Sequence, residues 1–111
     1  MATRYLPGEI EQLVLLAVLR LNGEGYAVPV RDLIVREGRV GVSRGTIYVT
    51  LDRLEQKGLL RSTFCDPQPI RGGKSRRVFH ITRSGMDALR HALGAVERLA
   101  AGTRLASEGI E

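Results

Sequence analysis

Tryptophan is absent from the 111 residues of this chain, and cysteine occurs only once. A single thiol, at Cys65, cannot form a disulfide within the chain. Together with only two histidines, it offers too few ligands for a structural zinc site. We therefore expect no metal or other cofactor, and a reducing compartment.

Long apolar segments are also lacking. The longest uninterrupted apolar run covers the seven positions from Leu13 to Leu19, whereas a helix needs about 20 such residues to cross a bilayer. The beginning of the chain shows no charged region followed by the apolar core and cleavage site of a signal peptide. These absences predict a cytoplasmic protein without a membrane partner.

Motifs typical of enzymes are missing as well. The sequence contains no glycine-rich phosphate-binding loop, no cluster of metal ligands and no Gly-x-Ser-x-Gly turn. None of its serines has an evident base partner. We therefore expect that the protein is not an enzyme.

Acidic residues are outnumbered by basic ones. The chain has 17 Lys and Arg against 12 Asp and Glu, a net charge of +5, and a pI of about 10.1. Such a balance favours a polyanionic partner, either nucleic acid or an acidic membrane surface, and charge alone does not distinguish the two. The length suits one small domain.

Six elements are expected from hydrophobic periodicity and from residues that begin or end helices and strands. Ser43 can cap the third helix and Thr82 the last, while Gly58 can end the third. The expected helices cover 9–21, 29–37, 43–57 and 83–101, and the expected strands cover 59–65 and 76–81. This order predicts a mainly α fold with a small β-hairpin, namely a winged helix-turn-helix domain with an added C-terminal helix.

The third expected helix lies in the stretch VSRGTIYVTLDRLEQKGLL, residues 42–60. At 3.6 residues per turn, Ile47, Leu51 and Leu54 fall on one narrow face, which fixes how the helix packs on the core. The remaining surface is small, hydroxylated or basic in several places, as a helix that enters the major groove of DNA requires. We therefore predict DNA contacts from six of its residues: Ser43, Arg44, Gly45, Thr46, Tyr48 and Arg53.

The turn of the expected hairpin is long and basic. Its sequence DPQPIRGGKS contains two prolines and a Gly-Gly pair, and four cations follow one another within seven residues that include no acid: Arg71, Lys74, Arg76 and Arg77. A basic tip beside a reading helix follows the DNA backbone or enters the minor groove, so we predict that this wing, residues 66–77, contacts DNA. A solvated loop without a partner is the alternative.

Three stretches resemble the PadR family of bacterial transcriptional regulators, and together they cover about residues 10–90: LVLLAVLRLNGEGYAV, VSRGTIYVTLDRLEQKGLL and GGKSRRVFHITRSGMDAL. The specific points are Gly25-Tyr26, the Gly-Thr-Ile-Tyr of 45–48 and the Ile-Thr-x-x-Gly of 81–85. Val49 stands where such regulators often have proline. The resemblance implies a winged-helix homodimer that binds DNA at promoters and blocks transcription.

Two residues outside the predicted contacts are expected to be structural. We expect Tyr26 to fill the core between the first two helices, and Cys65 to face the interior from a strand. Because no second cysteine is present to resolve a sulfenate, a redox role for Cys65 is not favoured.

The last expected helix predicts a second chain as its partner. Its apolar positions recur at alternating spacings of three and four, a pattern typical of paired helices, and the first helix is apolar on every face. We therefore predict a two-fold homodimer, with these interface residues: Leu13, Leu16, Met86, Leu89, Leu93 and Val96. Packing of the last helix on its own domain is the alternative. Two reading helices one DNA turn apart, about 34 Å, would select an inverted repeat.

These features predict a sequence-specific, DNA-binding transcriptional regulator, and the family resemblance implies a repressor. Its expected parts are a DNA-binding domain of residues 1–82, a dimerisation helix of residues 83–105 and a flexible tail of residues 106–111. Double-stranded DNA and a second copy of the chain are the expected partners, and a small-molecule effector is left open. The alternative is a winged-helix module that binds another protein and does not read DNA, for which outward basic and hydroxylated residues on the third helix would be unnecessary.

Overall fold

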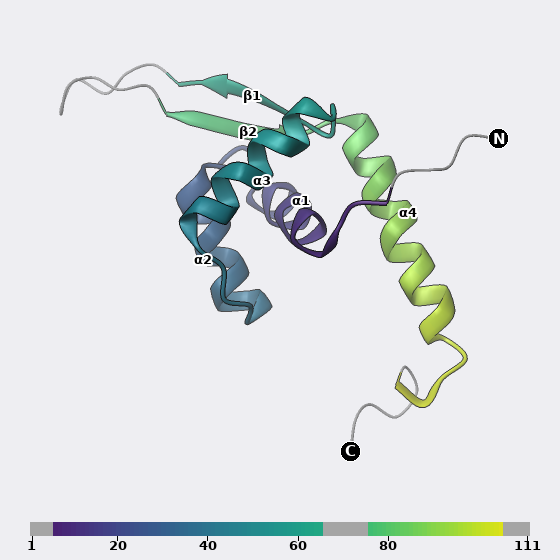
Figure 1. Ribbon diagram of the computed structural model, residues 1–111. Helices are drawn as coiled ribbons and strands as arrows, with labels where there is room; N and C mark the ends of the chain where they lie inside the picture. The colour runs from purple at the N-terminus through teal and green to yellow at the C-terminus, as the bar shows by residue number, and fades with distance from the viewer. Residues whose placement is uncertain (1–5, 66–75, 106–111) are drawn as a thin grey trace.

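Residues 6–65 and 76–105 are described by the computed structural model (Figure 1). Its elements follow the predicted order: α1 (Glu9–Leu21), α2 (Ala27–Gly38), α3 (Arg44–Gln56), β1 (Leu60–Phe64), β2 (Arg77–Ile81) and α4 (Arg83–Ala100). The prediction of a mainly helical winged helix-turn-helix fold is confirmed. None of the helices in the described ranges combines the length and apolar character needed to cross a bilayer.

The helix boundaries follow from local chemistry. The Ser43 hydroxyl accepts a hydrogen bond from the Thr46 backbone N–H at 3.1 Å, and the Thr82 hydroxyl accepts one from the Gly85 N–H at 3.0 Å, so both predicted N-caps are confirmed. Gly58, just beyond α3, has a φ of +79°, a conformation that favours glycine. The boundaries of α2 differ from the prediction.

Helix α2 begins at Ala27, two residues before the predicted start at Pro29. The helix was predicted to begin at Pro29 because proline fits the first helical turn, where its missing N–H would be unpaired anyway. None of the N–H groups of that turn has a partner within the helix, so proline is accepted at any of its positions. Pro29 therefore occupies the third helical position without loss of a hydrogen bond.

Helix α1 forms the centre of the domain. It contacts α2, α3, β2 and α4, and in Figure 1 it lies between the pair α2 and α3 on one side and α4 on the other. Val14, Leu15 and Val18 are buried against these neighbours, whereas Leu16 and Leu19 are partly exposed. Most of the apolar surface of α1 is therefore covered by its own chain, and only a narrow strip is left for a second chain to cover.

Close backbone approaches explain two glycines of the family-like motifs. Gly25 pairs with β2 through the Phe79 N–H, which donates to the Gly25 carbonyl at 2.9 Å, and a Cβ on Gly25 would collide with the Phe79 carbonyl. A Cβ on Gly85 would likewise collide with the Leu59 carbonyl, where α4 leaves the sheet. These positions fix how α2 and α4 meet the hairpin.

An ion pair ties α1 to the C-terminal end of α3. The Lys57 ammonium lies 3.0 Å from the Glu11 carboxylate, and this buried carboxylate also accepts a hydrogen bond from the Gly8 N–H at 2.9 Å. The hydroxyl of Thr82 donates to the Gly58 carbonyl at 2.7 Å and so joins the same end of α3 to the start of α4. These bonds help to set the position of α3 on the domain.

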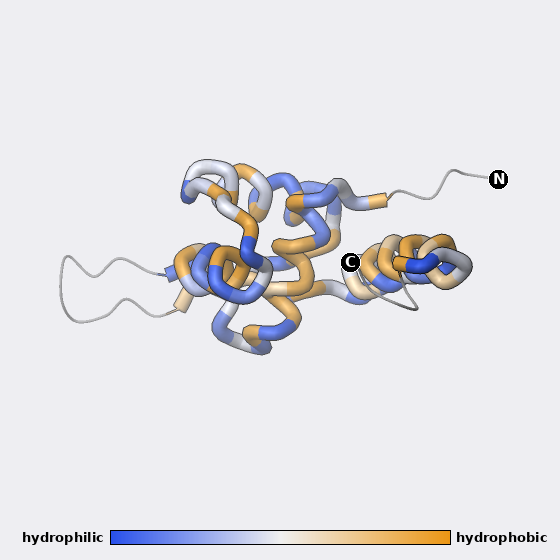
Figure 2. The backbone as a smooth tube through the Cα atoms, turned by 90° about the horizontal axis from the view of Figure 1, so that it is seen from below, coloured by the Kyte–Doolittle hydropathy of each residue, from blue (hydrophilic) through white to orange (hydrophobic). Residues whose placement is uncertain are grey.

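Helix α4 is covered by its own chain over its first half. Gly85, Ala88, Leu89 and Ala92 are buried, and the second half projects away from the other helices (Figure 1). Viewed from below, α4 stands apart from the group formed by α1, α2 and α3, and apolar and polar residues alternate along it (Figure 2). The second half of α4 thus presents apolar side chains that this chain does not cover within the described residues.

Candidate nucleic-acid interface

The outer surface of α3 is open to solvent at the positions predicted to meet DNA. Ile47, Leu51 and Leu54 are buried, as predicted, and they hold the helix at one rotation about its axis. Tyr48 and Val49 are 52% and 54% exposed. The prediction of the buried face is confirmed, and the exposed face carries an aromatic ring and a branched apolar side chain.

The first turn of α3 has a defined hydrogen-bond arrangement. Besides capping the Thr46 N–H, the Ser43 hydroxyl donates to the Thr46 hydroxyl at 3.0 Å, so both hydroxyls are engaged with each other. Arg44 and Gly45 beside them are exposed. A Cβ on Gly45 would meet only the Ser43 hydroxyl oxygen, at 3.9 Å, and Gly45 has no positive φ. The fold therefore does not require a glycine at this position.

The exposed residues occupy distinct sides of α3. At 3.6 residues per turn, Tyr48 and Asp52 lie toward β2, and Thr46 and Arg53 lie on the opposite side. Val49 lies between the two sides, at the centre of the outer face. Val49 was not among the predicted contact residues, although an outward apolar side chain on a reading helix was the signal that could have identified it.

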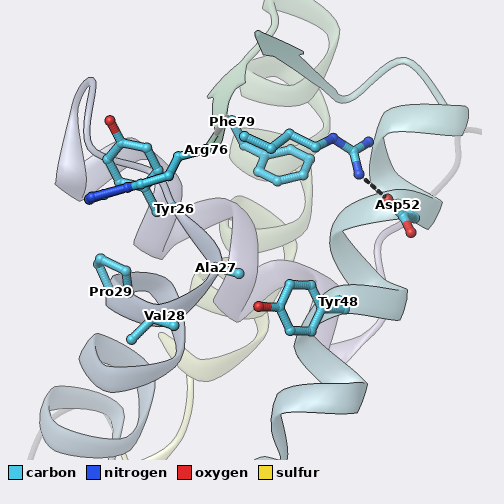
Figure 3. Close-up of a pocket in the computed structure, with 9 residues that line it drawn as sticks. Tyr26, Ala27, Val28, Pro29, Tyr48, Asp52, Arg76 and Phe79 are labelled. Carbon is cyan, nitrogen blue, oxygen red and sulfur yellow. Dashed lines mark hydrogen bonds and ion pairs between the residues drawn. The ribbon is translucent and has the colours of Figure 1, made fainter. Parts of the chain in front are cut away.

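A hollow of about 550 Å³ opens between the start of α2, the side of α3 and the base of the hairpin (Figure 3). Tyr26 and Pro29 lie on the α2 side, Tyr48 lies across from them on α3, and Phe79 lies at the hairpin (Figure 3). The full lining comprises Tyr26, Ala27, Val28, Pro29, Tyr48, Asp52, Arg76, Arg77 and Phe79. Three predicted contacts, Tyr48, Arg76 and Arg77, thus share one concave surface.

The expectation that Tyr26 fills the core is wrong. Its ring is half-buried at the wall of the hollow, with the Arg76 guanidinium 4.5 Å from the ring centroid. The Tyr26 hydroxyl forms a hydrogen bond with the Cys65 thiol at 3.2 Å, and this bond, together with burial, raises the pKa of the Tyr26 phenol. Cys65 is half-buried one residue beyond β1, and does not lie in the interior of a strand. Gly25 pairs with β2, which places the next residue, Tyr26, beside the hairpin.

Arg77 is engaged with acidic residues of α3. Its guanidinium donates to Asp52 Oδ1 at 2.8 Å and also to Glu55 Oε1, and the group lies 4.7 Å from the centroid of the Phe79 ring. Arg76, the residue before it, is exposed. Two adjacent arginines that the sequence grouped together therefore have different surroundings. Arg71 and Lys74, the other predicted wing contacts, lie outside the described residues.

The predicted interface residues of α1 and α4 differ in exposure. Leu89 is buried in the core of its own domain, and Leu13, Met86 and Leu93 are half-buried. Leu16 is partly exposed, and Val96 is 60% exposed. Leu99 is 80% exposed and was not among the predicted residues, although its position three residues after Val96 continues the helical spacing.

The three helices, the hairpin and the exposed face of α3 define a winged helix-turn-helix protein of the DNA-binding class. A model of the transcriptional regulator PadR-like family matches residues 15–91. The chain belongs to this family, whose members are regulators of transcription rather than enzymes.

Individual proteins agree with this assignment. The transcriptional regulator Rv3488 of Mycobacterium tuberculosis is 46% identical over 59 residues, which are 53% of this chain and 51% of that protein. The matched segment thus spans about half the length of this curated relative. A PadR-like transcription factor from Bacteroides fragilis has a TM-score of 0.69 at 23% identity, over 83% of this chain and 84% of its own. A PadR-like regulator from Bacillus cereus has a TM-score of 0.67 at 22% identity, over 91% of this chain and 93% of its own. At these identities, the two structures show that the fold is shared.

Proposed function

We propose that the protein binds double-stranded DNA as a homodimer and represses transcription, with α3 lying in the major groove. The observation that carries this proposal is the exposed face of α3 around Tyr48 and Val49, on a helix whose rotation is fixed by buried aliphatic residues. An α-helix fits the major groove of B-DNA, where base edges are distinguishable. Membership of a family of transcriptional regulators supports the same function.

Base reading is assigned to the N-terminal half of α3. Gly45 lets the helix backbone come close to the bases, and Val49 can pack on a thymine methyl group. The proposed role of the Tyr48 hydroxyl is to donate to a phosphate. Thr46 and Ser43 contribute mainly by holding the first turn, because their hydroxyls are bonded to each other.

Backbone binding is assigned to cations that flank this surface. Arg44 lies at the start of α3, Arg53 lies further along it, and Arg76 lies at the edge of the hollow. Arg71 and Lys74 of the wing complete the proposed set of phosphate contacts. Such contacts give affinity that falls as salt is added, and they carry little sequence preference.

The dimer is assigned to the uncovered apolar residues of α4, together with the exposed strip of α1. Val96 and Leu99 extend beyond the domain on one helix, where a second copy could pack its own α4 against them. The division into a DNA-binding domain of residues 1–82, a dimerisation helix of residues 83–105 and a tail of residues 106–111 follows from this assignment. Two reading helices one DNA turn apart, about 34 Å, select an inverted repeat.

The test is a fluorescence anisotropy titration with a labelled duplex taken from upstream of the protein's own gene, at two salt concentrations. We expect binding that weakens steeply with salt, and a loss of about tenfold or more for Tyr48→Ala. Arg44→Ala and Arg76→Ala should also weaken binding. Arg36→Ala is the matched control, because it removes the same charge from an exposed residue at the far end of α2. Tight binding that none of the three substitutions weakens would contradict the proposed interface.

A further inference from the structure

We propose that Arg77 is a positioning residue that neutralises Asp52 and Glu55 on the DNA-facing helix and joins the hairpin to that helix, and that it does not itself contact DNA. This inference rests on the proposed function. It separates Arg77 from Arg76, its neighbour in the basic wing of the sequence.

Three elements meet at the Arg77 guanidinium. It donates to Asp52 Oδ1 at 2.8 Å, to Glu55 Oε1 and to the Ser62 hydroxyl at 3.2 Å, and so spans α3 and β1 from its place on β2. The Ser62 hydroxyl in turn donates to Glu55 Oε2 at 2.7 Å. The face of the Phe79 ring packs beside the guanidinium, 4.7 Å away. All three guanidinium nitrogens are therefore used inside the protein.

Glu55 and Arg77 both stay charged at neutral pH. The hydrogen bond from Ser62, together with the one from Arg77, holds the pKa of the Glu55 carboxyl below its ordinary value even though burial opposes this. Burial alone would lower the pKa of Arg77, but its hydrogen bonds to Asp52 and Glu55 outweigh burial and raise it. A permanently charged guanidinium with planar, directed donors suits the paired carboxylates better than an ammonium group would.

The position of Asp52 makes this neutralisation relevant to DNA. Asp52 lines the hollow together with Tyr48, which lies one helical turn earlier (Figure 3), and Arg77, the partner of Asp52 in its ion pair, lines the same hollow. An unpaired carboxylate there would repel the phosphates that Tyr48 and Arg76 are proposed to bind. Arg77 removes that repulsion and also links β2 to α3 through its ion pairs.

Arg76 and Arg77, which are adjacent at the start of β2, allow a contact with phosphate to be compared with the neutralisation of acids. Successive side chains of an extended strand point to opposite faces, and here Arg76 lies over the Tyr26 ring while Arg77 faces α3. Removal of a cation that contacts phosphate lowers the affinity of the protein for DNA, whether or not nearby acids are present. A cation that neutralises acids is needed only while those acids are present.

The experiment is a set of affinities for the duplex described above, measured at one salt concentration, with the melting temperature of every variant as a folding check. The variants are Arg77→Gln, the double variant Asp52→Asn/Glu55→Gln, and the triple variant that combines all three substitutions. Arg76→Gln is the control, alone and with the same double variant. The readout is the loss of duplex affinity that follows substitution of each arginine, measured once with the two carboxylates present and once with them replaced.

We expect Arg77→Gln to weaken binding about tenfold and the triple variant to return to within about threefold of wild type. The loss from Arg76→Gln should be the same with and without the carboxylates. The double variant, which keeps Arg77 and nearly the same shape, should bind at least as tightly as wild type. This expectation still tests the inference if Arg77→Gln fails to fold.

Three results would overturn the inference: unchanged binding by Arg77→Gln, a triple variant that stays as weak as Arg77→Gln, or a double variant that binds more weakly than wild type. If wild type and Tyr48→Ala behave as proposed while the triple variant is not restored, only the role of Arg77 is wrong. If wild type shows no salt-dependent binding to the duplex, the proposed function and this inference both fail.

Discussion

Helices α1 and α4 are both rich in apolar residues, but their environments differ. Helix α1 is apolar on almost every side and is enclosed by α2, α3, β2 and α4 of the same chain. Helix α4 is apolar along one side, and the second half of that side is not covered by the described residues. Uniform apolar character thus marks a helix buried within the domain, whereas the one-sided stripe that runs past the domain is the surface we propose for a second chain.

The apolar stripe of α4 has a buried part and an exposed part. Leu89 is buried in the domain, Leu93 packs at its edge, and Val96 and Leu99 lie beyond it. The alternative drawn from the sequence, packing of the helix on its own domain, thus holds for its first half, and the dimer contact stays a proposal for its second half. Substitutions along α1 and α4 can break this comparison.

The largest effect is expected in the enclosed helix. Leu15 in α1 is fully buried, so Leu15→Ala should lower the free energy of unfolding by about 2–5 kcal/mol through lost contacts and a cavity. Urea unfolding followed by circular dichroism measures this change. The matched substitution Leu99→Asp should leave the helical signal unchanged, and the comparison fails if the two variants lose equal amounts of folded structure.

The next effect concerns assembly. The double variant Val96→Asp/Leu99→Asp should turn a two-chain particle into a folded single chain, because it places charges on the uncovered part of α4. Light scattering gives the mass, and circular dichroism checks the fold. Arg98→Asp, which adds an acid on another side of the same helix, should keep the two-chain mass. A wild-type protein that is already a single chain at micromolar concentration would refute the dimer.

A smaller effect separates stability from DNA reading in α3. Gly45→Ala should raise the free energy of unfolding by up to about 1 kcal/mol, because alanine favours a helix and the added methyl group has space. The same methyl group should weaken duplex binding, because it would stand between the helix backbone and the bases. Equal or tighter binding by this variant would remove Gly45 from the proposed contact surface.

The smallest effect is a pH dependence at the hairpin. The folded state lowers the pKa of Glu55, so its stabilising contribution is present above the pKa of the unfolded chain and is lost as the pH falls through the folded value. Urea unfolding of wild type and Glu55→Gln between about pH 3 and pH 7 should therefore show a difference that shrinks toward acid. A constant difference across this range would show that ionisation of Glu55 contributes nothing.

Much of the fold could be predicted because its signals are local. Ser43 and Thr82 cap helices through bonds to residues three positions later, and the buried stripe of α3 follows directly from helical spacing. The start of α2 was misplaced because proline is tolerated at several positions of a first turn. Local chemistry thus gives the order of elements more accurately than their ends.

The parts of the site that could not be predicted depend on contacts between distant segments. Arg77 and Asp52 are 25 residues apart in the sequence, and they meet because β1 packs against α3 and β2 pairs with β1. Tyr26 was wrongly assigned to the core, because its burial depends on where β2 passes and local sequence does not determine this. Charge in a sequence indicates a basic segment, but the fold decides which of its cations are already paired.

The most direct test of the account is to map the amide chemical shifts of isotope-labelled protein as the duplex is added. We expect the largest changes in residues 43–49 of α3 and at Arg76, with little change in residues 96–100 of α4. Changes confined to α4, with none along the exposed face of α3, would contradict the proposal that this face binds DNA.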